Sequence, residues 1–190
     1  KRMHKVYPFE SYDEYVKVQT DINKEKLNWV YVKRRVIKAI ADNVIAASCI
    51  LCHGSRNGAE QKYFKQFYPH AYVLGTEISD TATQFPDTVQ WDMQMEKKEW
   101  VGKFDIVYSN AFDHCIYPEQ TLETWKNQLC LRGSLFLEYS EKQSVYQASD
   151  PLLATLKEVK QLLNDVGFTY IQEVQNASPP SEGVLLRCKP

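Results

Sequence analysis

The sequence lacks several features that would assign it to a special class of protein. No apolar run approaches the ~20 residues needed to cross a bilayer, and residues 1–10 lack the apolar core of a signal peptide. The 5 cysteines lie at irregular spacing, which is not the pattern of a disulfide framework. We therefore expect a cytoplasmic protein with reduced thiols and no membrane partner.

Neither sign of charge is in excess. The 23 Lys and Arg and the 24 Asp and Glu leave a net charge of −1, which creates no long-range field for a phosphate backbone, so we expect no nucleic-acid partner. The apolar fraction of 44% and the charged fraction of 25% are ordinary for a globular protein. A chain of 190 residues suits one domain, and we expect residues 1–190 to form it.

Two helical patterns occupy the first 43 residues. Ser11 followed by Glu14 has the form of a capping box and predicts a short helix that continues to Gln19. Apolar residues at three- and four-residue steps predict a longer amphipathic helix from Leu27 to about Asp42. Two helices are thus expected before the sheet.

Strands and helices then alternate along the chain. The segment Val44–Cys52 is almost continuously apolar, which is typical of a central strand buried on both faces. This alternation predicts an α/β fold, a three-layer sandwich around a mostly parallel sheet. The other elements expected are the helix Gly58–Tyr68, the strands Ala71–Thr76, Thr88–Trp91 and Phe104–Ser109, the helix Pro118–Leu131 and the strand Ser134–Tyr139.

The C-terminal part predicts one more helix and a hairpin. Asp150 and Pro151 resemble an N-cap and first-turn pair, and the helix that they begin would stop at Gly167. The last two strands, Phe168–Val174 and Val184–Cys188, are joined by a connection too short for a helical crossover. They are therefore expected to pair antiparallel, which completes a seven-stranded sheet with a C-terminal antiparallel strand.

A glycine-containing turn, Gly54-Ser55-Arg56-Asn57-Gly58, joins the central strand to the next helix. Gly54 lets the chain pass tightly over the strand end, and a side chain at Gly58 would obstruct a ligand that approaches the backbone. Glycines also serve plain strand-to-helix turns, so this turn by itself is not specific. It is a candidate ligand-binding loop.

Polar residues also follow three other strands. Glu77 lies 19 residues after Gly58, at a strand tip where an acid accepts hydrogen bonds from ribose hydroxyls. Asp92 follows the next strand, and a carboxylate in that position can accept a hydrogen bond from an adenine amino group. Asn110 follows the strand after that. Capping of Ser79 by Glu77, and a solvated turn at Asp92, are the alternatives. Because ligands of open α/β sheets bind outside the carboxyl ends of the strands, these residues together predict a nucleotide-like ligand.

The most specific pattern lies in the second half of the chain. It consists of Phe104-Asp105-Ile106-Val107-Tyr108-Ser109-Asn110, then Phe112-Asp113-His114, and finally Leu131-Arg132-Gly133-Ser134-Leu135. This stretch resembles the fourth and fifth motifs of the class I S-adenosylmethionine-dependent methyltransferases, and the likeness extends from Val44 to Cys188. It implies a Rossmann-like fold, S-adenosylmethionine as cofactor and transfer of its sulfonium methyl group.

The resemblance also implies roles for single residues. The turn Gly54–Gly58 would wrap the methionine part of the cofactor, and Glu77 would hold the ribose hydroxyls, with Ile78 beside it as a further cofactor-binding candidate. Asp92 and Met93 would flank the adenine. Asn110 would border the methyl group.

Two residues depart from the family pattern. Cys52 stands where the family usually has an acid, and Arg56 replaces the middle glycine of the turn. We expect Arg56 to pair with the methionine carboxylate, because a guanidinium suits a carboxylate fork. A solvent-facing Arg56 is the alternative.

The methyl acceptor is expected between residues 1–43 and the loop Ser140–Asp150, which includes Tyr146. Asp113 lies on the same side, and His114 is a candidate general base because imidazole titrates near neutrality. His114 can equally pack under the cofactor, since methyl transfer proceeds largely by alignment of the two reactants. The mixed polar and aromatic content of these segments favours a small hydroxylated acceptor such as a sugar.

Other classes of function stay open. The departures at Cys52 and Arg56 allow a non-catalytic module that serves a partner. An NAD(P)-dependent oxidoreductase shares the ribose-binding acid, but the chain lacks GxGxxG. Cys49-Ile50-Leu51-Cys52-His53 matches the CxxCH haem pattern, yet residues three apart on a strand point to opposite faces, so neither haem nor a metal site is predicted.

Overall fold

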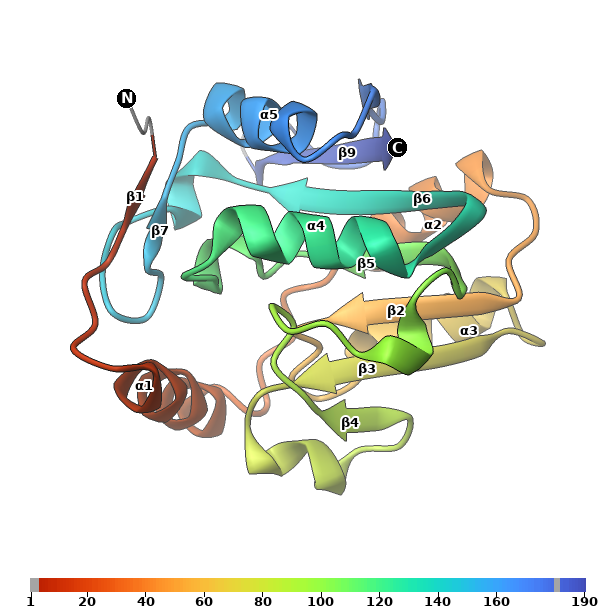
Figure 1. Ribbon diagram of the computed structural model, residues 1–190. Coiled ribbons are helices and arrows are strands. Elements are labelled where there is room, and N and C mark those ends of the chain that lie inside the picture. Colours follow the sequence, from red (N-terminus) through yellow and green to blue (C-terminus); the bar gives the residue numbers. More distant parts are fainter. Residues whose placement is uncertain (1–3, 180–181) are drawn as a thin grey trace.

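A computed structural model describes residues 4–179 and 182–190 of the chain. Its centre is a seven-stranded sheet in the order β4-β3-β2-β5-β6-β9-β8, with helices on both faces (Figure 1). The strands are β1 (Lys5–Val6), β2 (Cys49–His53), β3 (Tyr72–Glu77), β4 (Thr88–Gln90), β5 (Phe104–Ser109), β6 (Leu129–Tyr139), β7 (Leu152–Leu153), β8 (Tyr170–Glu173) and β9 (Val184–Lys189). The helices are α1 (Tyr12–Glu25), α2 (Arg34–Asn43), α3 (Ala59–Phe67), α4 (Pro118–Gln128) and α5 (Leu156–Asp165).

The direction of the strands confirms the predicted α/β sandwich. β4, β3, β2, β5 and β6 run parallel to one another. β9 is antiparallel to both β6 and β8, as the short connection between the last two strands requires. Residues 180–181 of that connection lie outside the described residues.

Two apolar clusters hold the layers together. One contains Leu122 and Trp125 of α4 and Val159 of α5, packed on one face of the sheet. The other contains Ile37 of α2 and Phe64 of α3 on the opposite face. Each such buried side chain contributes about 1.5–3 kcal/mol relative to an exposed one, so both helix layers are firmly attached to the sheet.

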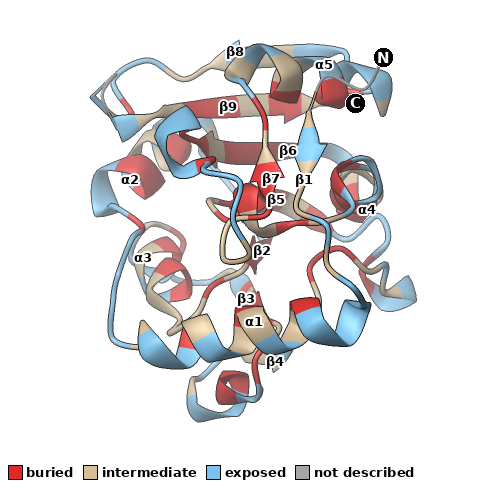
Figure 2. Cartoon of the chain, turned by 90° about the vertical axis from the view of Figure 1, so that its left-hand side faces the viewer, coloured by how far each residue is buried: buried red, intermediate tan, exposed pale blue. Residues whose placement is uncertain are grey.

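The remaining elements lie at the carboxyl ends of the parallel strands. There α1 crosses in front of β3 and β4, and β1 pairs antiparallel with β7 (Figures 1 and 2). These elements enclose the edge at which the sequence predicts a ligand. In the described residues no helix is long and apolar enough to span a membrane. All 5 cysteines are free thiols, as their spacing predicts.

The N-terminal helices differ from the expected bounds. Ser11 caps α1 as predicted by accepting a hydrogen bond from the Glu14 amide, but α1 continues to Glu25. The second helix begins at Arg34, so the prediction of a helix from Leu27 was wrong. The side chain of Asn57 donates to the backbone carbonyl oxygens of Leu27 (2.9 Å) and Trp29 (3.1 Å), which fixes an irregular path before α2.

The central strand and the fourth helix are shorter than expected. β2 begins only at Cys49, and Ile45 in the segment before it is 95% exposed, because the apolar run from Val44 includes a surface turn. α4 ends at Gln128 rather than at Leu131. The next residue starts β6, which is longer than predicted and pairs there with the first residue of β5.

The start of the last helix was also predicted wrongly. Asp150 and Pro151 do not cap it, and Leu152–Leu153 pair with β1 instead. The N-cap is Thr155, whose hydroxyl accepts from the Glu158 amide while the Glu158 carboxylate accepts from the Thr155 amide. This complete capping box satisfies two free backbone N–H groups at the helix start, which explains why the helix begins there and not at the Asp-Pro pair.

His53 at the end of β2 is buried among polar partners. Its Nδ1 lies 3.0 Å from the Thr76 hydroxyl, its Nε2 lies 2.7 Å from Gln128 Oε1, and its ring stacks on Trp125. Burial lowers the pKa of His53 to about 4. The imidazole is therefore neutral in the folded protein at pH 7.

We predict that His53 makes stability fall as the pH falls. Between its unfolded pKa near 6.5 and its folded pKa of about 4, the unfolded chain binds a proton that the folded chain does not, which costs roughly 1.4 kcal/mol per pH unit. In urea unfolding, the stability advantage of the wild type over His53→Gln should shrink between pH 7 and pH 5. A difference between the wild type and His53→Gln that stays constant from pH 7 to pH 5 would contradict the assignment.

Candidate functional site

A cavity of about 360 Å³ opens at the carboxyl edge of the parallel strands. Residues of α1 form part of its wall, and its volume is in the range that ligand pockets of folded proteins usually have. The cofactor-side candidates that line it are Gly54, Ser55, Arg56, Asn57, Glu77 and Ile78. The other predicted residues that line it are Asp92, Met93, Asn110, Asp113 and His114.

The turn after β2 depends on an uncommon backbone conformation. Gly54 has a φ of +68°, and a Cβ added there would lie 2.6 Å from the Cβ of Ala111, which follows β5. Arg56 also has a positive φ of 44°, which costs energy in a residue other than glycine. The turn is thereby pressed against the end of β5 and exposes its backbone to the cavity.

The side chain of Arg56 points over an aromatic ring. Its guanidinium lies 5.0 Å from the ring centroid of Tyr31, in the segment before α2. Its Nε atom is buried and has no hydrogen-bond partner in the described part of the chain. A buried donor without a partner costs about 1–3 kcal/mol, so this atom is available to an anionic group in the cavity.

Glu77 ends β3 with a buried carboxylate. Its Oε2 accepts a hydrogen bond from the Arg56 amide (3.0 Å), and its Oε1 accepts one from the Ser79 amide (3.2 Å). Burial raises the pKa of Glu77, and the two amides and the Arg56 guanidinium oppose that rise. The predicted capping of Ser79 is therefore real, but the same carboxylate also lines the cavity.

Asp92 follows β4 and is held by α1. Its Oδ2 accepts a hydrogen bond from the Tyr12 hydroxyl (2.6 Å), and its Oδ1 accepts one from the Gln94 amide (2.9 Å). Met93 is buried next to it, near the Gly54 turn. The carboxylate thus has a fixed orientation beside the cavity.

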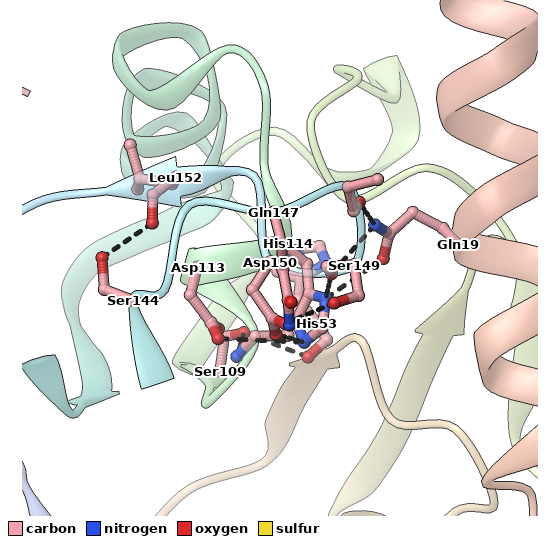
Figure 3. A network of polar contacts seen from close by, with 12 residues as sticks. Gln19, His53, Ser109, Asp113, His114, Ser144, Gln147, Ser149, Asp150 and Leu152 are labelled. Atoms are coloured by element: carbon pink, nitrogen blue, oxygen red, sulfur yellow. Dashed lines mark hydrogen bonds and ion pairs between the residues drawn. The ribbon is translucent and has the colours of Figure 1, made fainter. Parts of the chain in front are cut away.

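His114 lies at the other end of the cavity, in a 3₁₀ turn over Phe112–His114. Its Nδ1 is 2.8 Å from the Ser149 carbonyl oxygen and 3.1 Å from Gln19 Oε1 (Figure 3). Because a carbonyl oxygen can only accept, Nδ1 carries a proton, and in the neutral imidazole the lone pair is then on Nε2. Burial raises the pKa of the neighbouring Asp113 carboxyl group, and the interaction with His114 partly opposes this by lowering it.

Two predicted residues do not line the cavity. Gly58 has a φ of +77° and precedes α3, so its left-handed backbone explains the glycine. A Cβ at Gly58 would contact Gln61, Thr88 and Phe85 at 3.8–3.9 Å instead of obstructing a ligand. Tyr146 is exposed and its ring packs edge-on against Tyr7.

Several cavity residues were not predicted from the sequence. Tyr15, Gln19 and Asn23 lie one turn apart on α1 and form a buried row facing the sheet edge, although two of them are polar amides. Their four-residue spacing was the available signal. Asp150, expected as an N-cap, also lines the cavity.

The wall near α3 contains two further carboxyl groups that the sequence did not indicate. Burial raises the pKa of Glu60 to about 8, so this side chain is mostly protonated at pH 7. Glu138, near the end of β6, accepts a hydrogen bond from the Tyr108 hydroxyl (2.7 Å). Burial is the main cause of the raised pKa of Glu138. This wall is polar but carries less negative charge than its composition suggests.

Comparison with known proteins identifies the fold. No protein-family model matches the sequence, and no curated protein matches it either. Many solved structures do match, however, and those of methyltransferases that use S-adenosylmethionine are prominent among them. The chain has the class I Rossmann-like methyltransferase fold.

Three structures illustrate this similarity. The 1,6-didemethyltoxoflavin-N1-methyltransferase of Burkholderia thailandensis, solved with S-adenosylhomocysteine, has a TM-score of 0.69 and 15% identity over 95% of this chain and 90% of its own. A TehB-like methyltransferase from Corynebacterium glutamicum has a TM-score of 0.63 and 14% identity, with coverages of 93% and 97%. The N-methyltransferase NodS of Bradyrhizobium japonicum, solved with S-adenosylhomocysteine, has a TM-score of 0.64 and 13% identity, with coverages of 90% and 98%.

We predict that Asn57 holds the segment 26–33 over the cavity. Asn57→Ala removes both hydrogen bonds to that segment, so hydrogen exchange and proteolysis there should increase several-fold. Asn43→Ala is the matched control, because the Asn43 side chain donates to the Ala39 carbonyl oxygen within α2 and not to residues 26–33. Equal protection of residues 26–33 in Asn57→Ala and in the wild type would show that other contacts fix the segment.

Proposed function

We propose that the protein is an S-adenosylmethionine-dependent methyltransferase that acts on a small molecule. The observation that carries this proposal is the buried carboxylate of Glu77, which lies at a strand end inside the cavity and beside a turn with positive φ. An acid at this place in a doubly wound sheet suits a ribose diol. The matching structures described above are only 13–15% identical and support the fold alone, so the proposed activity depends on the site residues.

The cavity residues fit the cofactor from end to end. Glu77 would accept the ribose hydroxyls, and Ile78, Asp92 and Met93 would flank the adenine. The turn Gly54–Asn57 would contact the methionine part through its backbone. The unpartnered Nε of Arg56 would donate to the methionine carboxylate, which relieves the cost of its burial.

When bound, S-adenosylmethionine would supply its sulfonium methyl group to a nucleophilic oxygen of the acceptor, and S-adenosylhomocysteine would be the leaving group. Asn110 borders the place of transfer, and residues 1–43 and the loop 140–150 enclose the acceptor side of this single domain. In the absence of a bound metal ion, His114 Nε2 accepts the acceptor hydroxyl proton, because its lone pair is free and Ser149 fixes the ring. Polar groups on that side favour a small hydroxylated acceptor such as a sugar, in the cytoplasm.

The cofactor is tested by calorimetric titration with S-adenosylmethionine, S-adenosylhomocysteine and NAD. We expect micromolar binding of the two adenosyl compounds and none of NAD. Glu77→Gln should weaken adenosyl binding at least about tenfold, because hydrogen bonds to a charged acceptor contribute about 1.5–3 kcal/mol each. The exposed Glu96→Gln variant should bind as the wild type does. Binding of NAD alone would instead support an oxidoreductase.

Catalysis is tested by transfer of a labelled methyl group to a pool of small hydroxylated metabolites. We expect incorporation by the wild type, and about 10²–10⁴-fold slower incorporation by His114→Gln at unchanged cofactor affinity, because a general base contributes that much. Cofactor binding without transfer to any acceptor pool would support the non-catalytic module. An unchanged rate in His114→Gln would exclude proton acceptance by this residue.

A further inference from the structure

Three ionisable side chains meet at the acceptor end of the cavity. Asp113 and His114 come from the 3₁₀ turn after β5, and Asp150 comes from the loop before β7 (Figure 3). One ligand atom of each lies within 4.8 Å of the other two. All three residues line the cavity, so a bound group would be accessible to an acceptor.

The distances between these groups are those of ion pairs that lack a hydrogen bond. His114 Nε2 lies 3.8 Å from Asp150 Oδ1 and 3.9 Å from Asp113 Oδ2. Both separations exceed the ~3.2 Å limit for a hydrogen bond from nitrogen to oxygen. Two ligands of one Mn²⁺ or Mg²⁺ ion, each about 2.1 Å from it, lie up to about 4.2 Å apart. Both separations from Nε2 therefore leave room for a shared ion.

Each side chain is prepared as a ligand. The Nδ1 proton of His114 is held by the Ser149 carbonyl, which leaves Nε2 as the donor atom. Asp150 Oδ2 accepts hydrogen bonds from the side-chain amide of Gln147 (2.7 Å) and from the Ser149 hydroxyl (2.5 Å). The other oxygen, Oδ1, faces His114. Such outer bonds orient the ligands of protein metal sites.

Asp113 is buried, and its ion pair with His114 is long, at 3.9 Å. Its side chain is only 7% exposed, and its carboxylate accepts no hydrogen bond from another residue in the described ranges 4–179 and 182–190. A buried carboxylate is costly unless it is paired, hydrogen-bonded or bound to a metal. A second carboxylate, Asp150, faces the same space, so a positive group there would stabilise both.

We propose that Asp113, His114 and Asp150 bind one divalent cation, of the Mg²⁺ or Mn²⁺ type, at the acceptor end of the cavity. Two carboxylates and one imidazole are a ligand set that Mn²⁺ accepts readily. The remaining coordination positions face the cavity. The expectation of no metal site, which rested on the cysteines and on the local motifs, did not consider Asp150.

The use of this cation rests on the proposed function. An acceptor with two neighbouring oxygens, such as a vicinal diol or a hydroxy acid, could occupy the open positions as a chelate. The cation would lower the pKa of the coordinated hydroxyl, which would lose its proton to water. The resulting oxygen would then attack the methyl group of S-adenosylmethionine and release S-adenosylhomocysteine. With the ion bound, Nε2 is a ligand and no longer accepts that proton.

Titration of the metal-free protein with Mn²⁺, followed by calorimetry and by the electron paramagnetic resonance of free Mn²⁺, tests the site without any acceptor. We expect one ion per chain and competition by Mg²⁺. Asp113→Asn, His114→Gln and Asp150→Asn should each weaken Mn²⁺ binding at least about tenfold. Asp92→Asn, another cavity carboxylate outside the trio, should leave the Mn²⁺ affinity unchanged.

Absence of Mn²⁺ binding, or binding that all three variants retain, would overturn the proposal. Circular dichroism of the metal-free variants, with thermal unfolding, establishes that each is folded, so a loss of binding is not a loss of structure. Titration of the same samples with S-adenosylhomocysteine separates the two proposals. Cofactor binding without Mn²⁺ binding refutes only the cation site, and Mn²⁺ binding without cofactor binding refutes only the methyltransferase.

Discussion

The buried carboxylate of Glu77 is the constraint on which the site depends. It accepts the amides of Arg56 and Ser79, and so it fixes the turn after β2 to the turn after β3. That turn also contains Asn57, which holds the backbone before α2. The same backbone places Tyr31 beneath the Arg56 guanidinium. One carboxylate therefore connects the sheet edge, the glycine turn and the segment that covers the cavity.

The sheet could be predicted because its signals are local and strong. Buried strands such as Phe104–Ser109 are mostly apolar, and a short connection between the last two strands requires that they pair as a hairpin. Helix bounds were less predictable where two signals compete. The helical spacing from Leu27 was overridden by bonds from Asn57, and the Asp150–Pro151 pair lost to the capping box at Thr155. The first outcome depends on a residue remote in the sequence, Asn57, and the second on a capping residue a few positions further along, Thr155.

The cavity residues at the strand ends could be predicted in the same way. Glu77 ends β3, Asp92 follows β4 and Asn110 follows β5, and parallel strands bring such residues to one edge. On the other side the sequence indicated residues 1–43 and 140–150 but not which side chains meet there, because α1 reaches this edge only through the tertiary fold. Buried amides on α1, such as Gln19, have meaning only when their partner, His114, is known. For the same reason the proximity of Asp150 to His114 is not visible in the sequence.

The central claim is that the carboxyl edge of this sheet is a binding site for S-adenosylmethionine. A crystal structure of the protein with S-adenosylhomocysteine tests it most directly. The account predicts that the ribose hydroxyls bond to the Glu77 carboxylate, that the adenine lies against Asp92 and Met93, and that the amino-acid carboxylate meets Arg56. A ligand bound elsewhere, or in this cavity with its ribose away from Glu77, would contradict the account.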